Sequence, residues 1–400
     1  MVAAAVRIVR DLDIAEEIAQ ETFARALDRW PAGAPERPGA WLLTATRRRA
    51  LDHWRRRRRA DAHADALAYE TVLGALDETT DVTDTEEIPD DRLRLIFTCC
   101  HPGLPADSRV ALTLRLVGGL STPEIAHAFL VPEPTIAQRL VRAKRTIRER
   151  ALPWEVPEGA ELAERLPAVL AVVYLIFNEG YAAHAGDALV RHELCGEAIR
   201  LGRMLTELMP GEPEVLGLLA LMELQGSRAA TRADAEGNLV LLADQDRTRW
   251  DRAAIARGLD GLEHAGSLDR AGPYRLQAAL AACHARAASW EATDWAQIVV
   301  LYEALAAATP SPVVALNRAV AIGMAVGPAA GLAALDAIEA GELRDYHLLP
   351  AARADFLRRL GRAAEAAVEY RRALALTDNT RERSFLRARL AACERDPAAG

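Results

Sequence analysis

The sequence predicts an all-helical protein built from more than one domain. Its 400 residues exceed the size at which a single hydrophobic core usually stops growing. The chain is 51% hydrophobic but only 5% aromatic, and its excess of Ala and Leu favours helices with small-residue contacts. No segment alternates polar and apolar residues in the manner of a half-buried strand.

Charge divides the chain into four parts. Residues 1–59 hold 13 basic and 8 acidic side chains, and residues 92–150 hold 10 basic and 4 acidic ones. Between them, residues 60–91 hold 11 acidic and no basic side chains, while residues 151–400 hold 26 basic and 34 acidic ones. Two basic modules therefore flank an acidic linker, although the whole chain has a net charge of −8.

We expect a first module over residues 1–60, an acidic flexible linker over 61–90, a second module over 91–152 and a helical domain over 153–400. Residues 1–10, "MVAAAVRIVR", have the pattern of the middle of a helix without a preceding cap. We therefore expect the first module to be short at its N-terminus: either further sequence lies upstream, or the first helix is short and frayed.

The first module contains a predicted helix from Asp11 to Trp30. Its apolar stripe, which we expect to pack on other helices, consists of Leu12, Ala15, Ala19, Phe23, Ala26 and Trp30. The other face is polar and mostly acidic, and it is either solvated or a docking face for a basic partner. That face consists of Asp13, Glu16, Glu17, Gln20 and Glu21.

A second predicted helix starts near Ala40 and ends in "LDHWRRRRRA". We expect its apolar side to consist of Trp41, Thr44, Leu51 and Trp54. Arginines at this density repel one another, and phosphate relieves the repulsion through bidentate contacts and counterion release. We interpret the arginine-rich end as a nucleic-acid contact rather than a solvated helix end.

The second module has the punctuation of a helix-turn-helix. A helix ends at Gly118-Gly119, Ser121 or Thr122 caps the next one, and Pro123 occupies its first position. After a turn at residues 130–132, a further helix places four apolar residues inward: Ile136, Leu140, Ala143 and Ile147. Its outer face consists of Gln138, Arg139, Arg142 and Arg145, which suit a helix in the major groove.

In this order, the two modules resemble the conserved regions of the extracytoplasmic-function (ECF) sigma factors of the sigma-70 family. "AEEIAQETFARAL" is similar to the region 2 helix that docks on the β′ coiled coil of RNA polymerase. "WLLTATRRRALDHWRRRR" is similar to the helix that engages and melts the −10 element. "LSTPEIAHAFLVPEPTIAQRLVRAKRTIRE" is similar to region 4, which reads the −35 element.

This resemblance implies roles for individual residues. Asp13, Glu16, Glu17, Gln20 and Glu21 would face the polymerase. The −10 strand would be contacted by Trp41, Arg47, Arg48, Arg55, Arg56 and Arg58, and the −35 groove by Thr135, Gln138, Arg139, Arg142 and Arg145. Ala137 departs from the Lys or Arg common in the wider group, and Arg48 stands where many relatives have Asn.

Six further stretches are similar to the subgroup with a long, tetratricopeptide-like helical extension. They are "RWPAGAPERPGAWLL", "FTCCHPGLP", "FNEGY", "LADQDRTRWDR", "EATDWAQIVVLYEAL" and "SPVVALNRAVAI". The resemblance implies core RNA polymerase (β′ coiled coil and β flap) and promoter DNA as partners. It also suggests a small YCII-type (DGPF) protein as a partner and no separate anti-sigma factor.

The C-terminal domain shows one internal repeat. "GPAAGLAAL" from Gly327 and "GRAAEAAVE" from Gly361 lie 34 residues apart, which is the tetratricopeptide period. Stacked helical hairpins form either a concave groove for a peptide or protein ligand or a self-contained scaffold. We interpret the polar clusters "FNEGY" and "DQDR" as networks that join helices.

Two other classes of function compete with a sigma factor. Cys99, Cys100 and His101 could form a thiol nucleophile or metal site, but five cysteines without zinc-ligand spacing favour packing, so we predict no enzyme, metal or cofactor. An ordinary helix-turn-helix regulator with a tetratricopeptide-like sensing domain would bind duplex DNA without polymerase. The absence of an apolar run of membrane-spanning length, or of a signal-peptide pattern, predicts a cytoplasmic protein.

Overall fold

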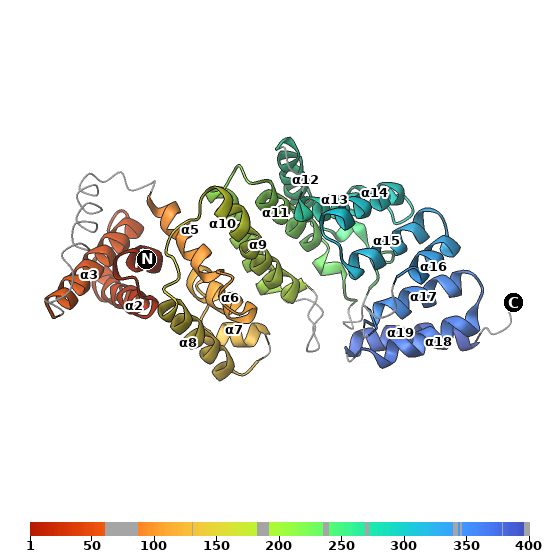
Figure 1. The fold of residues 1–400 in the computed structure, drawn as a ribbon, viewed down its shortest axis with the longest axis horizontal. Helices are drawn as coiled ribbons and strands as arrows, with labels where there is room; N and C mark the ends of the chain where they lie inside the picture. Colours follow the sequence, from red (N-terminus) through yellow and green to blue (C-terminus); the bar gives the residue numbers. More distant parts are fainter. Residues whose placement is uncertain are drawn as a thin grey trace. The chain divides into compact units, whose positions relative to one another are not determined.

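The structure is a computed structural model. The residues that it describes are 1–60, 87–129, 131–181, 192–234, 240–268, 272–338, 343–344, 346–377 and 379–395. Helices make up all the regular elements of these ranges and no β-strand is present in them, so the all-α prediction is confirmed (Figure 1). Most of the predicted acidic linker, residues 61–86, lies outside these ranges. The chain falls into two compact units, Met1–Val172 and Val173–Gly400.

The first unit begins with the helices of the first module. They are α1 (Val2–Val9), α2 (Leu12–Arg29), the 3₁₀ turn η1 (Trp30–Ala32) and α3 (Pro38–Ala60). The Asp11 carboxylate caps α2 by accepting the N–H groups of Asp13 (2.9 Å) and Ile14 (3.3 Å). Helices α1, α2 and α3 pack on one another, and α1 also packs on α5 (Glu87–Cys99) of the second module.

Two predicted core positions of the first module are wrong. Phe23 is 51% exposed, and the neighbouring Thr22 is buried in its place, with its hydroxyl donating to the carbonyl of Ile18 (2.7 Å). Thr44 is exposed as well, whereas Thr46 is buried and donates to the carbonyl of Leu42 (2.7 Å). A threonine that bonds to the carbonyl four residues earlier satisfies its hydroxyl inside a helix, so it can replace an apolar residue in the core.

The second module contains five short helical elements. They are α5 (Glu87–Cys99), α6 (Ala106–Thr113), the π-helical turn η2 (Leu114–Gly118), α7 (Thr122–Phe129) and α8 (Glu133–Glu149). Gly119 has φ of 80°, a left-handed conformation that glycine adopts without strain, and it ends η2. Helices α6 and α7 both pack on α8, whose four predicted inward residues are all buried.

A reciprocal capping box fixes the start of α7. The Glu124 carboxylate accepts hydrogen bonds from the backbone N–H and the hydroxyl of Ser121, both at 2.6 Å. In return, the Ser121 hydroxyl accepts the backbone N–H of Glu124 at 3.4 Å. These hydrogen bonds from Ser121 lower the pKa of Glu124. Of the two predicted caps, Ser121 is therefore the one used.

The first unit continues past the second module into the beginning of α9 (Gly159–Tyr181). Thr98 of α5 donates its hydroxyl to the carbonyl of Pro153 at 3.0 Å. Arg165 of α9 is only 6% exposed, and it donates to the carbonyl of Phe97 at 3.0 Å while its guanidinium lies 5.6 Å from the Phe97 ring centroid. The helix-turn-helix is thus supported by residues that follow it in the chain.

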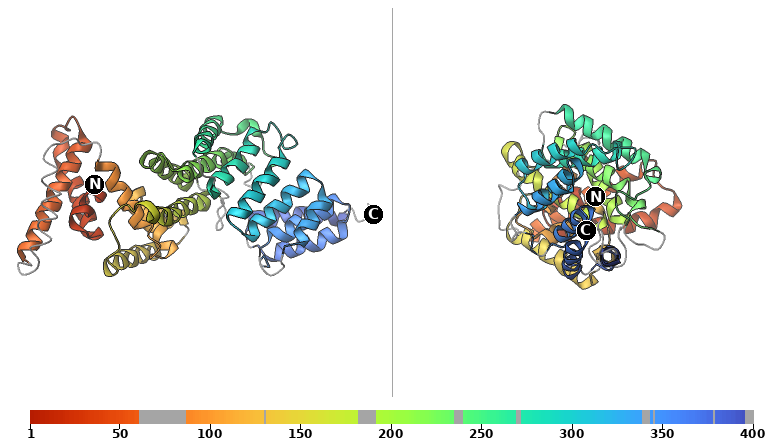
Figure 2. Two further views of the ribbon diagram at one scale, coloured as in Figure 1. Left: turned by 45° about the horizontal axis from the view of Figure 1, so that its top comes forward. Right: turned by 90° about the vertical axis from the view of Figure 1, so that its right-hand side faces the viewer.

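The second unit is a succession of helices (Figures 1 and 2). They are α10 (His192–Leu208), α11 (Pro213–Gly226), α12 (Arg252–Ser267), α13 (Pro273–Arg286), α14 (Trp295–Ala308), α15 (Pro312–Ala325), α16 (Pro328–Asp336), α17 (Leu348–Arg359), α18 (Ala363–Ala375) and α19 (Thr380–Arg395). Consecutive helices pack on each other from α10 to α19. Gly327 and Gly361, the repeat positions, both have positive φ and precede α16 and α18.

Candidate nucleic-acid interface and acidic docking face

The outer face of α8 is open to solvent over most of its predicted length. Gln138, Arg142 and Arg145 are exposed, and Thr135 is partly buried. Arg145 forms an exposed ion pair with Glu149 one turn later (3.4 Å). Among the described residues, Arg142 has no ion-pair partner, so its guanidinium donors are available to an external acceptor.

One residue that was predicted to face the DNA groove, Arg139, already forms an ion pair within the chain. Arg139 forms an ion pair with Asp107 at the start of α6 (2.9 Å), and its side chain is 28% exposed. This contact holds Arg139 against its own module, beside the exposed face formed by Gln138 and Arg142. A DNA contact by Arg139 would compete with Asp107.

The predicted DNA-contacting residues of α3 differ in their surroundings. The Trp41 ring packs edge-to-face on Trp30, with centroids 5.8 Å apart, so it is partly buried at the turn before α3. Arg48 is exposed, as are Arg55 and Arg56, whereas Arg47 is partly buried. The side chain of Arg58 lies outside the described residues. Exposed arginines therefore extend along α3 into its C-terminal half.

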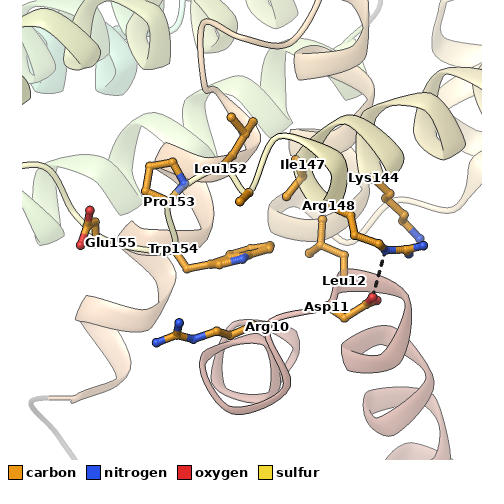
Figure 3. A pocket seen from close by; sticks show the side chains of 11 residues that line it. Arg10, Asp11, Leu12, Lys144, Ile147, Arg148, Leu152, Pro153, Trp154 and Glu155 are labelled. Carbon is orange, nitrogen blue, oxygen red and sulfur yellow. Dashed lines mark ion pairs between the residues drawn. The ribbon is translucent and has the colours of Figure 1, made fainter. Parts of the chain in front are cut away.

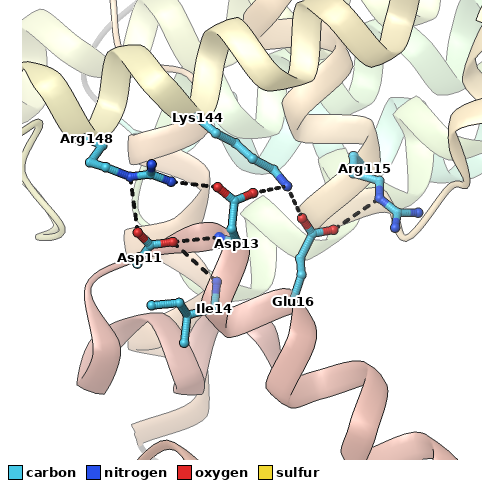
Figure 4. A network of polar contacts seen from close by, with 7 residues as sticks. All are labelled: Asp11, Asp13, Ile14, Glu16, Arg115, Lys144 and Arg148. Atoms are coloured by element: carbon cyan, nitrogen blue, oxygen red, sulfur yellow. Dashed lines mark hydrogen bonds and ion pairs between the residues drawn. The ribbon is translucent and has the colours of Figure 1, made fainter. Parts of the chain in front are cut away.

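The acidic face of α2 is engaged by the second module (Figure 4). We call these contacts the ion-pair cluster. Arg148 of α8 pairs with Asp11 (3.1 Å) and Asp13 (2.6 Å), and Lys144 pairs with Asp13 (2.9 Å) and with Glu16. Arg115 of η2 pairs with Glu16 at 3.1 Å. Two of the five predicted polymerase-facing residues, Asp13 and Glu16, thus bind basic side chains of the second module.

The ionisation of the cluster follows from these contacts. Burial disfavours the charge of Asp13, but the hydrogen bond and charge of Lys144 and the charge of Arg148 outweigh it and lower the Asp13 pKa. Burial likewise disfavours the charged form of Lys144, but Glu16 and Asp13 raise its pKa above the usual value. Asp13 and Lys144 are therefore both charged near pH 7.

The contact between α2 and α8 is not closely packed. A cavity of about 390 Å³ lies beside the ion-pair cluster, bounded by the turn between α1 and α2, the end of α8 and the segment that follows α8 (Figure 3). Trp154 lines it together with Arg10 and Leu12. A contact made by ion pairs around a cavity separates more readily than a closed apolar interface, because little apolar surface is exposed when it opens.

The rest of the acidic face remains open. Glu17 and Gln20 are exposed, and Glu21 pairs with Arg49 of α3 (2.8 Å). Phe23 (51% exposed) and Leu27 (74% exposed) follow on the same face of α2. We missed both as functional candidates, since an apolar residue at helical spacing is usually a core residue. Exposed apolar side chains with a polar rim are typical of protein interfaces.

The cysteine pair of the second module is buried. Cys99 and Cys100 are at most 1% exposed; burial raises the pKa of Cys100 to about 11 and raises that of Cys99 well above its usual value. Thiols that stay protonated and inaccessible are neither nucleophiles nor metal ligands. His101 accepts the backbone N–H of Gly103 through Nδ1 (3.0 Å). Across the described ranges, no group of three metal-ligating side chains is assembled.

No helix within the described part of the chain combines the length and apolar character needed to cross a bilayer.

Comparison with protein-family models gives three matches. Residues 1–60 match sigma-70 region 2, and residues 94–147 match sigma-70 region 4. Residues 165–266 match a family of unknown function (DUF6596). The first two matches cover α2, α3 and most of α8, the helices that carry the predicted docking and DNA-contacting residues.

Relatives are found over both the whole chain and its first part. An uncharacterized protein of Rhizobium meliloti (strain 1021) is 46% identical over 99% of this chain and 93% of that protein. The probable ECF RNA polymerase sigma factor SigI of Mycobacterium tuberculosis is 32% identical over 39% of this chain and 53% of SigI. The ECF RNA polymerase sigma factor SigK of Mycobacterium ulcerans is 30% identical over 36% of this chain and 74% of SigK. No solved structure matches the chain.

Proposed function

Because the chain belongs to the ECF group of the sigma-70 family and is an RNA polymerase sigma factor for transcription initiation, we propose that it binds core RNA polymerase through α2 and directs it to promoters with separate −10 and −35 elements. The observation that carries this proposal is the combination of an exposed basic face on α8 with a second, acidic and apolar face on α2. A regulator that binds duplex DNA alone needs only the first of these.

We assign the −35 element to α8 and the −10 element to α3. On α8, Gln138 and Arg142 would read base edges, while Arg145 and Thr135 would contact phosphate or sugar. On α3, Arg48, Arg55, Arg56 and Arg58 would hold the strand by charge, and Trp41 would offer a ring for stacking. Region 4 would meet the β flap of the polymerase, and α2 its β′ coiled coil.

In vitro transcription with core polymerase tests the proposal. The purified full-length chain should convert core polymerase to promoter-specific initiation on templates drawn from its own genome. The competing proposal, a helix-turn-helix regulator, predicts specific binding to duplex DNA without polymerase and no initiation by core polymerase. Sequence-specific binding of the free chain together with inactive core polymerase would favour that alternative.

Substitution Arg142→Ala should weaken −35 recognition by about 1–3 kcal/mol, or roughly 5–150-fold, if the guanidinium makes a bidentate contact with a base. The loss should be confined to templates with the preferred −35 base, because only that base accepts both hydrogen bonds. Transcription from a series of −35 variants measures it. Arg150→Ala, which changes an exposed arginine beyond α8, is the matched control. An equal loss on every −35 variant would argue against base reading.

The ion-pair cluster must open for the proposed promoter complex to form. Elements at −10 and −35 lie about 25 base pairs apart, roughly 85 Å along B-DNA. Helices α2 and α8 are in direct contact, so regions 2 and 4 cannot reach both elements while the cluster is intact. The polymerase would therefore compete with α8 for Asp13 and Glu16.

Removing the α8 charges that bind these acidic residues should weaken the competition between α8 and core polymerase. The double variant Lys144→Gln/Arg148→Gln should bind core polymerase about fivefold more tightly than the natural chain, because Asp11 and Asp13 are released and Glu16 keeps only Arg115. The gain should shrink as added salt screens the cluster. Arg145→Gln, which removes an exposed charge outside the cluster, is the control. Fluorescence-detected binding to core polymerase without DNA measures both; unchanged or weaker binding by the double variant would contradict the competition.

The C-terminal helical domain is proposed to control promoter activity. The boundaries 1–60, 61–90, 91–152 and 153–400 are kept as a proposed division, with residues 153–172 packed on region 4. A small YCII-type (DGPF) protein remains a predicted partner, and no described surface is assigned to it.

A further inference from the structure

The second compact unit contains a cavity that the sigma-factor function does not use. It has a volume of about 460 Å³ and is lined by residues from helices α9, α11, α13, α14 and α15 and from the segment before α12. Small-molecule sites in proteins have volumes of about 300–1,000 Å³. We propose that this cavity binds a small organic monocarboxylate, with its carboxylate at Arg228 and its apolar body against the ring of Trp250.

The cavity gathers sequence stretches that are far apart in the chain. "LADQDRTRWDR" contributes Leu242 and Trp250, and "EATDWAQIVVLYEAL" contributes Ile298, Tyr302 and Leu305. "SPVVALNRAVAI" contributes Ser311, Val313, Val314 and Asn317. Three stretches that lie outside the two sigma-70 regions therefore meet around one space.

One side of the cavity is apolar and held in place. Trp250 is 3% exposed, its indole N–H donates to the Thr231 hydroxyl (3.1 Å), and the Arg247 guanidinium lies 4.9 Å from its ring centroid. Arg247 in turn donates to the carbonyls of His284 (2.6 Å) and Ala287 (2.8 Å). The "DQDR" cluster thus joins helices, as its sequence suggests, and fixes an aromatic wall against which an apolar group can pack.

The charge of the cavity is positive and uncompensated. None of its lining residues is acidic, and no acidic side chain in the described ranges forms an ion pair with Arg228. The Arg228 guanidinium lies 5.7 Å from the ring centroid of Tyr181. Burial lowers the pKa of His284 to about 4, aided by the charges of Arg228 and Arg247, so this histidine is neutral near pH 7. Arg228 is partly buried, and a partly buried cation without a counter-ion favours the binding of an anion.

A helix terminus strengthens this preference. Ser311, at the N-cap of α15, makes no capping hydrogen bond with its side chain, and Val313 and Val314 of the first turn line the cavity. The first N–H groups of a helix and its dipole attract negative charge. This terminus and Arg228 line the same space, so they act on the same ligand.

The number of free cations selects a monoanion. Arg247 already donates to two carbonyls and His284 is neutral, so Arg228 is the cation left to bind a ligand in this cavity. A guanidinium matches a carboxylate through two parallel hydrogen bonds. A phosphate dianion would keep an unpaired charge beside apolar residues such as Leu280 and Ile298. Acetate would carry the charge but leave the apolar wall unfilled.

Calorimetric titration of the full-length protein tests the proposal. The probes are indole-3-acetate, 3-phenylpropionate and decanoate at up to millimolar concentration, each beside its primary amide, with acetate and inorganic phosphate as charge-only controls. At least one carboxylate should bind one per chain and at least about tenfold more tightly than its amide and than acetate or phosphate. If every carboxylate fails to saturate, or binds no better than its amide or than phosphate, the assignment is wrong.

Two variants locate the site. Arg228→Gln should weaken the best carboxylate at least about tenfold and leave its amide nearly unchanged, whereas Arg249→Gln, an exposed arginine outside the cavity, should change neither. Val313→Trp, at a 38% exposed position on the cavity wall, should block both ligands and keeps the test decisive if Arg228→Gln does not fold. Full affinity in folded Arg228→Gln or Val313→Trp would place the ligand elsewhere. None of these measurements involves polymerase, so their failure leaves the sigma-factor function untouched.

Discussion

Truncation of the chain after Leu152 is expected to abolish promoter-directed transcription, although the truncated chain keeps both sigma regions. The cut removes the carbonyl of Pro153, which accepts the Thr98 hydroxyl, and Arg165, which covers the ring and carbonyl of Phe97. It also removes Leu166, which is 6% exposed in the intact chain. Loss of each large buried apolar contact costs about 1.5–3 kcal/mol, against a total stability of about 5–15 kcal/mol. Region 4 should therefore unfold or bind poorly.

A reporter assay and a core-polymerase pull-down measure this loss, with chain levels checked in parallel. Arg165→Met in the full-length chain is the matched variant: it keeps the stem of the side chain but removes the hydrogen bond to Phe97, and it should reduce the thermal stability of the chain without abolishing activity. A chain ending after Tyr181, which retains all of α9, should recover core-polymerase binding. Higher activity than the natural chain in that variant would mean that the C-terminal domain inhibits. Wild-type activity after truncation at Leu152 would show that region 4 needs none of these residues.

The second large effect is expected when the two exposed apolar residues of α2 are substituted, and it is an effect on binding to core polymerase. The double variant Phe23→Ser/Leu27→Ser should weaken binding to core polymerase by about 30-fold or more, since apolar anchors at the centre of an interface commonly contribute at least about 2 kcal/mol. Phe23 and Leu27 are mostly exposed in the free chain, so their loss should leave the urea midpoint of unfolding nearly unchanged. Equilibrium binding to labelled core polymerase measures the effect.

Val326→Ser is the control for this experiment, because Val326 is 76% exposed and its loss removes exposed apolar surface outside α2. It should leave polymerase binding unchanged. Two results would count against α2 as the docking helix: equal affinity of the double variant and the natural chain, or an equal loss in the Val326→Ser control.

Local signals in the sequence predicted much of the fold. The cap at Ser121 and the inward residues Ile136, Leu140, Ala143 and Ile147 depend on spacings of three and four residues, and the structure has them where the pattern predicts. Phe23 and Thr44 were misplaced because helical spacing fixes which residues share a face but not which face meets the neighbouring helix. Thr22 and Thr46 satisfy their hydroxyls within the helix, an arrangement that a search for apolar residues overlooks.

The same limit applies to the candidate sites: the sequence predicts a site that lies on one helix, but not a site formed by contacts between distant residues. The exposed face of α8 follows from one helix and could be predicted from its arginines. The ion-pair cluster joins residues more than ninety positions apart, such as Glu16 and Arg115, and no local pattern contains that pairing. The carboxylate cavity likewise depends on how five helices pack, although three of the stretches that line it stand out in the sequence.

Helix α8 has two basic faces: Arg142 and Arg145 lie on the proposed DNA-binding face, and Lys144 and Arg148 lie in the ion-pair cluster. Their separation has a consequence for how the sequence of this protein can evolve. Around the helix axis, Arg142 lies roughly 160° from Lys144 and roughly 120° from Arg148, given 100° per residue. Substitutions of Arg142 should therefore add in free energy to those of Lys144 and Arg148 instead of coupling with them. The promoter sequence that this sigma factor prefers can therefore drift without altering how firmly its two regions hold each other.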